Sequence, residues 1–325
     1  MGVKRLVANI PFEHAGKRLD QALAAMFPDF SRSKLQQWMQ DGHVRVASLQ
    51  PRSSDRVKGG ETVEIQIPET RDYSWEAQAI PLSIVYEDQH LLVIDKPAGL
   101  VTHPGPGNRE GTLLNALLHH APQLQSIPRA GILHRLDKDT SGLLVVAKNE
   151  STRLRLVGEL RQRRIKREYL AIVNGVVIAG GDIDAPIARH PQHRTRMAVS
   201  LRGKSATSRY RVKTRFRAHT LLQIQLGSGR THQIRVHMAH IGFPIVGDPT
   251  YGGRMRVPAS TGDRLSQTLR GFRRQALHAA KLGLVHAATG KTLEWTTPLP
   301  DDMQALIDAL KEDALAGTLS HKGRG

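Results

Sequence analysis

The first part of the chain shows two helical patterns followed by short alternating segments. Apolar residues at helical spacing predict one helix over residues 17–27 and a second over residues 32–41. Ser31 precedes the second stretch and is expected to cap its N-terminus. Residues 44–46 and 62–67 alternate apolar and polar side chains, as short strands do. The pattern therefore predicts a compact α+β module at the start of the chain.

From residue 84 onward, many short apolar segments are separated by turn residues, and helical patterns become fewer. Strands are expected over residues 84–86, 91–94, 132–136, 143–147, 169–173, 208–212 and 220–226. Helices are expected over residues 113–120, 151–161, 231–240 and 301 to near 315. No repeating β-α-β alternation, G-x-G-x-x-G or Walker sequence occurs. The fold class is therefore α+β, with a mixed, largely antiparallel sheet and flanking helices.

The domain organisation follows from length and from one irregular segment. A chain of 325 residues indicates two domains. Residues 68–80 carry charges, a tyrosine and a tryptophan but no clear period, so we expect them to be a linker. They would join a small domain of residues 1–67 to a larger one of residues 81–317. Residues 318–325 are expected to form a frayed basic tail.

Charge adds a partner to this picture. The chain has 47 Lys and Arg against 29 Asp and Glu, which gives a net charge of +18. Residues 151–170 carry seven basic and two acidic residues, and residues 189–217 carry ten basic residues and no acidic one. Each run alone is typical of a solvated face, but two unbalanced runs in one domain repel themselves and need a counter-charge. Nucleic acid is therefore the first expected partner, ahead of an acidic membrane surface.

Composition also excludes several classes of chemistry. The chain contains no cysteine, so disulfides, iron–sulfur clusters, thiolate zinc sites and cysteine nucleophiles are ruled out. Its start lacks the apolar segment of a secretory signal, and no apolar run approaches the ~20 residues of a membrane span. We therefore expect a soluble cytoplasmic protein with no membrane partner.

The segment with the most chemical information is residues 131–148. Two expected strands flank residues 137–142, which predicts a hairpin with Asp137 at the lip of a strand and Arg135 on the same face. A carboxylate held in such a place is a candidate nucleophile or base. Because aspartate also favours turns, Asp139 is interpreted as a turn residue, and for Asp137 the residue pattern leaves both interpretations open.

For a tyrosine and for three histidines, a structural role has to be weighed against a functional one. A tyrosine in an apolar strand, such as Tyr169, is usually a core residue. His232, His237 and His240 are spaced by five and three residues, which does not align them on one helix face, and no H-E-x-x-H sequence is present. No metal site is therefore expected, and RNA contact or packing is the preferred role of these histidines.

Several separate motifs resemble, in the same order, those of pseudouridine synthases of the RluA/RluD type. They are residues 134–137 (HRLD), 140–143 (TSGL), 167–169 (REY), 229–237 (GRTHQIRVH), 245–249 (IVGDP) and 275–279 (QALHA). Near the start, residues 17–20 (KRLD) and 31–34 (SRSK) resemble the small αL-type RNA-binding domain found in a ribosomal protein. The resemblance implies that residues 1–67 form that RNA-binding domain and residues 81–317 the pseudouridine synthase catalytic domain.

The resemblance also implies a reaction and a site. The glycosidic bond of a uridine is cut, the base rotates, and its C5 atom is joined to the ribose, with no cofactor and no metal. The implied catalytic residues are Asp137 as the attacking carboxylate, Tyr169 stacked on the base, and Arg235 paired with Asp137. The implied substrate-binding residues are Arg135, which fills the space left by the flipped uridine, and His134, Arg230, His232 and Gln233. The implied RNA-binding residues are Arg18, Arg32, Ser33, Lys34, Arg163, Arg164, Lys166, Arg194 and Arg196.

Within the family the chain most resembles the RluD-like branch. That implies modification of uridines in large-subunit (23S) ribosomal RNA, in the stem-loop at the subunit interface. We expect the enzyme to be a monomer. Free RNA and the assembling large ribosomal subunit both remain open as partners. Two alternatives are a ribosome-assembly factor without catalysis and a glycosidase that uses Asp137 and Asp139 as a carboxylate pair. The second suffers from its geometry, because residues two apart in a tight turn are poorly placed to flank one bond.

Overall fold

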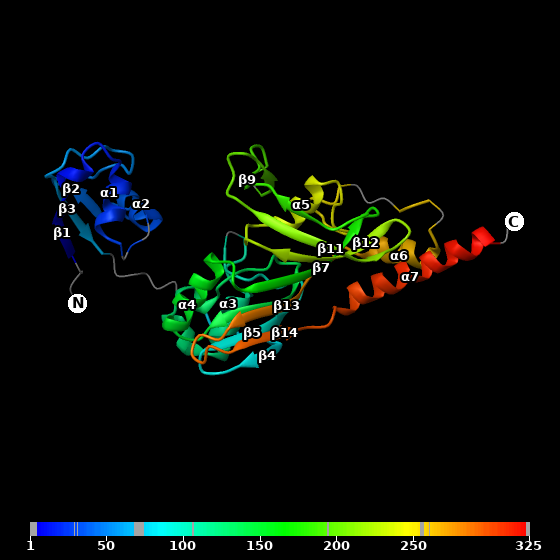
Figure 1. Cartoon of the computed structure of the whole chain (residues 1–325). Coiled ribbons are helices and arrows are strands. Elements are labelled where there is room, and N and C mark those ends of the chain that lie inside the picture. Colours follow the sequence, from blue (N-terminus) through cyan, green and yellow to red (C-terminus); the bar gives the residue numbers. More distant parts are fainter. Residues whose placement is uncertain are drawn as a thin grey trace. The chain divides into compact units, whose positions relative to one another are not determined.

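The computed structural model describes residues 5–28, 30, 32–67, 75–105, 107–193, 195–253, 257–259 and 261–322. The chain divides into two compact units, Met1–Ser74 and Trp75–Gly325 (Figure 1). Among the described residues, no helix has both the length and the apolar character needed to cross a membrane. The units are described separately below.

The first unit packs two helices on a three-stranded antiparallel sheet of order β1-β3-β2. Its elements are β1 (Arg5–Asn9), η1 (Phe12–His14), α1 (Leu19–Met26), α2 (Arg32–Gln40), β2 (Val44–Val46) and β3 (Thr62–Gln66). Both predicted helices and both predicted strands are present, with Leu23, Leu35 and Ile65 fully buried between them. The predicted N-cap Ser31 lies outside the described residues. Strand β1 was not predicted, because only Leu6 and Ala8 of it face the core.

The second unit is built on a nine-stranded sheet of order β4-β5-β6-β13-β7-β12-β11-β8, with β14 paired to β13. Only β6 and β13 run parallel; the other pairs are antiparallel, so the prediction of a mixed, largely antiparallel sheet is confirmed. The strands are β4 (Ile84–Glu87), β5 (Leu91–Lys96), β6 (Ser141–Ala147), β7 (Lys166–Asn174), β8 (Gly181–Asp184), β11 (Thr207–Arg215), β12 (His219–Leu226), β13 (Leu277–Val285) and β14 (Thr292–Thr296). A separate ribbon joins β9 (Ile187–Arg189) to β10 (Met197–Val199).

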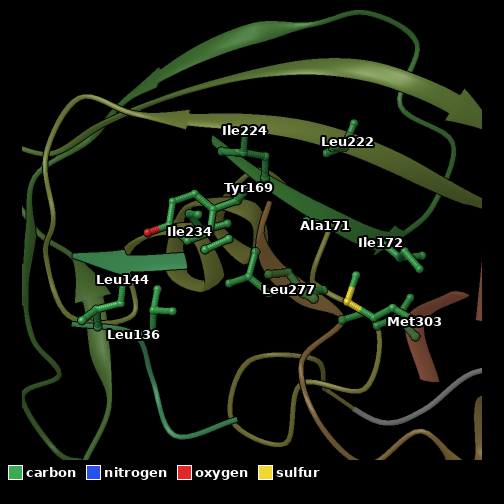
Figure 2. Close-up of a cluster of buried hydrophobic side chains, with 14 of the residues drawn as sticks. Leu136, Leu144, Tyr169, Ala171, Ile172, Leu222, Ile224, Ile234, Leu277 and Met303 are labelled. Carbon is green, nitrogen blue, oxygen red and sulfur yellow. The ribbon is translucent and has the colours of Figure 1, made fainter. Parts of the chain in front are cut away.

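Among the described residues, five α-helices accompany this sheet, and the predicted helix over residues 113–120 is confirmed at both ends. They are α3 (Leu113–His120), α4 (Glu150–Arg161), α5 (Gln233–His240), α6 (Asp263–Gly271) and α7 (Asp301–Lys322), with short turns η2 (Pro122–Ser126) and η3 (Pro128–Gly131) after α3. Tyr169, Ala171, Leu222 and Ile224 of β7 and β12 pack with Ile234 of α5 in one apolar cluster (Figure 2). This cluster supports the part of the sheet that carries the candidate site.

The predicted hairpin around Asp137 is wrong in its first half. Residues 132–136 do not form a strand; only Ile132 makes a single bridge, to Val146 of β6. The edge of β6 is occupied instead by a side chain, because the Nε2 atom of His134 accepts a hydrogen bond from Val145 N at 3.3 Å. Gly131 enters this loop with φ 74°, where a Cβ atom would lie 1.9 Å from Ala147 O. The chain therefore enters the loop at a position that only glycine fits, and its pairing with β6 stops at Ile132.

Prediction from the sequence also missed one strand and set the end of one helix too early. Strand β13, at the centre of the sheet, was not predicted, because His278, Lys281 and Gly283 interrupt its apolar residues and Val285 alone is β-branched. Helix α7 continues to Lys322, past the expected end near residue 315 and into the expected tail of residues 318–325. Its first turns are anchored by buried Met303, Leu306 and Leu310, and one interior glycine costs a helix only about 1 kcal/mol.

Candidate active site

Five of the six motifs of the second unit contribute residues to one pocket of about 840 Å³; the exception is the motif of residues 245–249. Its wall contains residues 132–137 of the loop before β6, the start of β7, residues 226–232 after β12, and the first turn of α5. Strand pairing explains why these segments meet, since β7 lies between β13 and β12 in the sheet. Asp137, Tyr169 and Arg235, the three residues expected to be catalytic, all line this pocket.

The backbone on both sides of Asp137 is fixed by buried polar groups. Thr102 Oγ1 donates a hydrogen bond to Leu136 O at 2.7 Å. Lys96 Nζ donates to Lys138 O at 3.0 Å and also to two carbonyls of its own loop. Lys96 is completely buried, and burial lowers its pKa to about 7 although the negative charges of Asp139 and Asp137 oppose the shift. The carboxylate of Asp137 is thus held on a loop whose two neighbouring peptides are anchored.

Arg235 lies between two carboxylates. Its Nη1 donates to Asp137 Oδ2 at 3.0 Å, while Nε and Nη2 donate to Asp248 Oδ2 and Oδ1 at 2.7 and 2.9 Å. Asp248 is also held by the backbone N–H groups of Thr250 and Tyr251. Burial works against the charge of Arg235, but the hydrogen bonds and charges of Asp248 and then Asp137 raise its pKa overall. The pairing expected between Arg235 and Asp137 is present, and Asp248 fixes the direction of the guanidinium.

His232 presents a third polar group to Asp137. It adopts a left-handed backbone conformation (φ 56°) at the N-terminus of α5. Its Nδ1 lies 2.8 Å from the hydroxyl of Tyr251, and that hydroxyl accepts a hydrogen bond from Met197 N, so its own proton points to Nδ1. Burial lowers the pKa of His232 although the negative charge of Asp137 opposes the shift, so the ring is neutral with its proton on Nε2, 3.9 Å from Asp137 Oδ1.

Tyr169 combines a core position with a pocket position. It pairs with Ile224 across β7 and β12, and its ring packs into the apolar cluster with 4% of its surface exposed (Figure 2). Burial raises the pKa of its phenol, although the positive charge of Arg167 opposes the shift. At neutral pH the phenol is therefore protonated, and its chemistry is that of a hydrogen-bond donor and an aromatic surface rather than of a base.

His134 and Arg135 precede Asp137 and face different surroundings. Arg135 is exposed and lines the pocket, so it shares the pocket with Asp137 although no strand places it there. Burial, and then the positive charge of Arg167, lower the pKa of His134 to about 3. Its ring is neutral, and because Nε2 accepts the Val145 N–H, its proton lies on Nδ1.

Gln233 holds the loop that carries Arg230. Its Oε1 accepts hydrogen bonds from Ser228 Oγ at 2.7 Å and from Arg230 N at 3.0 Å. Its Nε2 donates to Thr207 O and Ser208 Oγ. Both ends of the amide are thereby occupied inside the protein, which gives Gln233 a positioning role. The exposed side chain of Arg230 is the one that lies open to a ligand.

The RNA-binding residues expected in the first unit lie near a buried carboxylate. Arg18 Nε and Arg32 Nη2 donate to the carboxylate of Asp20 at 3.2 and 2.8 Å. Asp20 is completely buried; burial opposes its charge, but hydrogen bonds from Arg18 and Arg32 lower its pKa overall. Both arginine side chains nevertheless remain more than two-fifths exposed. The side chains of Ser33 and Lys34 lie outside the described residues.

The basic residues expected in the second unit differ in how they are paired. Arg164 makes a two-pronged contact with Glu159, at 2.7 and 2.8 Å. Arg163 has φ 60° and lines the pocket, and across the described ranges no carboxylate lies within ion-pair distance of it. Of the other three basic residues, Lys166 and Arg196 are exposed, and Arg194 lies outside the described residues.

Sequence reasoning missed five residues that shape the pocket or fix its parts: Lys96, Arg129, Arg167, Asp248 and Tyr251. Asp248 belongs to a motif that was recognised, and Arg167 to another, but neither pattern reveals which partner each side chain meets. The structure shows a further mark of the site that the sequence does not. The pocket-lining residues Arg129, Arg163 and His232 have positive φ angles although they are not glycine. Such strain gathers at functional sites.

The three histidines of the motif after β12 do not converge. His237 is buried with Nδ1 at 2.9 Å from Ser208 Oγ and Nε2 at 2.9 Å from Ala185 O. His232 is bound to Tyr251, as described above. Within the part of the chain that the structure describes, no three His, Asp or Glu side chains gather as a metal site would require.

Comparison with known protein families gives this architecture a class. Residues 90–240 match the family model described as RNA pseudouridylate synthase, and residues 17–63 match the S4 domain. Among solved structures, human RNA pseudouridylate synthase domain containing 4 superposes with a TM-score of 0.56 at 25% identity, covering 70% of this chain and 93% of that one. Human RNA pseudouridylate synthase domain containing 1 gives a TM-score of 0.52 at 25% identity, over 72% and 96% of the two chains.

Curated relatives are much closer in sequence. The ribosomal large subunit pseudouridine synthase D of Pseudomonas aeruginosa is 54% identical over 306 residues, which covers 94% of this chain and 96% of that protein. The protein of the same name from Escherichia coli K12 is 51% identical over 310 residues, 95% of each chain. The chain therefore belongs to the RNA pseudouridylate synthase family. It is an RNA pseudouridine synthase with an N-terminal S4 domain, and the resemblance to the RluA/RluD type is confirmed.

Proposed function

We propose that this enzyme converts uridines of large-subunit (23S) ribosomal RNA to pseudouridine, with Asp137 as the attacking carboxylate. The carrying observation is the position of Asp137, whose carboxylate lies 3.0 Å from Arg235 in a pocket lined by basic and aromatic side chains. The substrate assignment is supported by the names of relatives 51–54% identical over nearly the whole chain. The net charge of +18 and the S4 domain support RNA as the polyanion that binds.

The proposed roles follow from the contacts. The proposed reaction needs a carboxylate as nucleophile, and Arg235, itself held by Asp248, keeps the carboxylate of Asp137 directed into the pocket. Tyr169 offers its ring to the uracil and a neutral phenol as a donor. Arg135, exposed at the rim, enters the space that the flipped uridine leaves. Extraction of a base costs a few kcal/mol, a magnitude that stacking and an inserted side chain can offset.

The finer substrate proposal is the stem-loop at the subunit interface, in free RNA or in an assembling subunit, with the enzyme acting as a monomer in the cytoplasm. No cofactor and no metal enter the proposed reaction. The two units have separate tasks: the S4 domain binds RNA close to the target, and the second unit performs the chemistry. A chain lacking residues 1–74 is expected to lose site selection and affinity before it loses the chemical step.

The decisive experiment replaces Asp137 by Asn, with Asp139→Asn as the matched control two residues away in the same loop. Pseudouridines are mapped in ribosomal RNA from cells that lack the gene and carry one variant or the wild type. We expect the Asp137→Asn protein to fold and bind RNA but to form no pseudouridine, while Asp139→Asn remains active. Pseudouridine formation by Asp137→Asn would refute the proposed role. Rescue of a ribosome-assembly defect by that inactive variant would reveal an additional non-catalytic role.

A further inference from the structure

Arg167 is a buried cation that the reaction described so far does not use. It stands two residues before Tyr169 on β7, so both side chains are on the same face of the strand, and both line the pocket. Arg167 is 7% exposed, and throughout the described ranges no carboxylate lies within ion-pair distance of it. Its one hydrogen bond, from Nη2 to Ser228 O, is 3.5 Å long, and its buried Nε has no acceptor among the described residues.

The surrounding chain makes room for this unpaired cation. Gly229 lies against it, since a Cβ atom built on Gly229 would be 2.9 Å from Arg167 Nη1. A buried unpaired charge ordinarily costs several kcal/mol, so a fold retains one only where another demand requires it. The feature is therefore best explained by a negatively charged or strongly accepting group that enters the pocket.

A second orphaned donor lies in the same pocket. His134 Nδ1, which carries the proton of the neutral ring, is buried and has no acceptor among the residues that the structure describes. The charge of Arg167 is close enough to contribute to the lowered pKa of His134. The pocket is thus lined by two residues whose buried N–H groups have no acceptor among the described residues, and Tyr169 lines the same pocket.

We propose that Arg167 and His134 bind the carbonyl oxygens of the target uracil and stabilise the negative charge that the base acquires when its glycosidic bond breaks. Uracil has two carbonyl oxygens and one N–H in its ring plane, so it supplies the acceptors that these donors lack. A ribose hydroxyl would not require a guanidinium. The inference rests on the proposed role of Asp137 and adds the groups that act on the leaving base.

The step balances without any further reactant. When the bond between ribose C1′ and uracil N1 breaks, its electron pair stays on the base and spreads over N1, O2 and O4. Asp137 Oδ forms a bond to C1′, or accepts the C2′ proton, as the sugar loses the base. The uracil anion then turns and attacks C1′ through C5, which releases the carboxylate or recovers the C2′ proton. Loss of the C5 proton and protonation of N1 complete the isomerisation. The negative charge on O2 and O4 is largest while the base is detached, where buried donors act most strongly.

The test compares two leaving groups in single-turnover reactions at saturating RNA. The substrates carry uridine or 5-fluorouridine at the target position, since fluorine makes the detached base a weaker base and thus a better leaving group. Consumption of the target nucleoside is measured for wild type, Arg167→Met, Arg167→Lys and His134→Phe. With uridine we expect Arg167→Met to slow the reaction by a factor of about 10²–10³, the effect of removing one preorganised donor of an oxyanion site.

With 5-fluorouridine the loss in Arg167→Met should be at least tenfold smaller, because that base needs less stabilisation. Arg167→Lys should recover part of the rate, and His134→Phe should show the same trend with a smaller loss. Equal losses with both bases would overturn the inference, as would a loss that appears only in RNA affinity. If Arg167→Met does not fold, Arg167→Lys and His134→Phe carry the same comparison. Failure of the proposed function looks different, because Asp137→Asn would then retain pseudouridine formation.

Discussion

Two arginines line the same pocket and have opposite surroundings. On the α5 side, Arg235 makes three hydrogen bonds to two carboxylates, so its charge is balanced before any substrate arrives. On the β7 side, Arg167 is almost as deeply buried but has one long hydrogen bond to a carbonyl. The first arrangement serves orientation, since it fixes a carboxylate in one direction. The second leaves charge uncompensated, and that charge becomes useful only when the pocket is filled.

The largest effect is expected where this pairing is removed on the α5 side. Arg235→Met leaves Asp248 buried and unpaired, which should lower the free energy of unfolding by about 3–5 kcal/mol and abolish activity. Urea unfolding and pseudouridine formation measure the two effects. The surface pair of Arg264 and Glu312 supplies the control, because Arg264→Met should cost no more than about 1 kcal/mol. Similar losses of unfolding free energy in both variants would show that the buried ion pairs of Arg235 stabilise the fold no more than a surface ion pair does.

A third buried cation, Lys96, gives a prediction that depends on pH. Its folded-state pKa of about 7 lies below the ordinary value of 10.5, so between these values the unfolded chain binds one proton more than the folded chain. The free energy of unfolding of wild type should therefore rise relative to Lys96→Met as pH increases from 7 to 10. The slope is at most about 1.4 kcal/mol per pH unit, and below pH 7 it should vanish. A difference independent of pH from 6 to 10 would contradict the lowered pKa.

On the β7 side, the same kind of replacement should have the opposite sign from Arg235→Met. Arg167→Met removes a buried charge that has no counter-charge, and the thioether side chain fills much of the same volume. We expect a free energy of unfolding equal to that of wild type or up to about 2 kcal/mol higher. Urea unfolding at matched pH decides the sign. A marked destabilisation would mean that Arg167 has a structural role in the free enzyme.

The smallest effect concerns adjacent arginines at the surface. Arg163 has no carboxylate partner among the described side chains, whereas Arg164 is held by Glu159. If Arg163 contacts a phosphate, Arg163→Gln should reduce the slope of log affinity against log salt by about 0.7–0.9. Arg164→Gln should change that slope less, because its charge is already balanced by Glu159. The slopes are measured by RNA binding at several salt concentrations. Equal changes of slope in the two variants would show that pairing with Glu159 does not decide which arginine contacts RNA.

Prediction from the sequence succeeded for some elements of the second unit and failed for others. Residues 113–120 have a clear apolar stripe, and the helix is found at both expected ends. Strand β13 lies in the middle of the sheet, but a histidine, a lysine and a glycine interrupt its apolar residues, so its sequence is neither alternating nor an unbroken apolar run. Residues 132–136 have the composition of a strand, but the ring of His134 takes the hydrogen bond that a strand partner would make. Strands β5 and β6 are also buried on both faces, but their unbroken apolar runs allowed their prediction. Local pattern therefore identifies clear apolar runs and helical spacing, and fails where polar residues or glycine interrupt a buried strand.

For the candidate site, the resemblance identified the segments but not the pairings. Asp137 and Arg235 were expected to meet, although 98 residues separate them, because both belong to recognised motifs. The second carboxylate on Arg235 and the hydroxyl on His232 were not foreseen, since a partner distant in sequence leaves no local pattern. Gln233 was expected to bind substrate, but its amide is occupied by neighbouring loops. A motif indicates that a polar residue matters, and only the folded chain determines what it touches.

The peptide groups on both sides of Asp137 are fixed by hydrogen bonds from buried side chains. Their carbonyls, those of Leu136 and Lys138, are held by Thr102 and by a lysine buried in the sheet, so the loop has little freedom to advance toward a target. If Asp137 is the nucleophile, as proposed, we expect the RNA rather than the loop to change shape so that the target nucleotide reaches the carboxylate. We then expect local RNA stiffness to influence which uridines are modified, with nucleotides in loosely stacked loops favoured over those in regular helices.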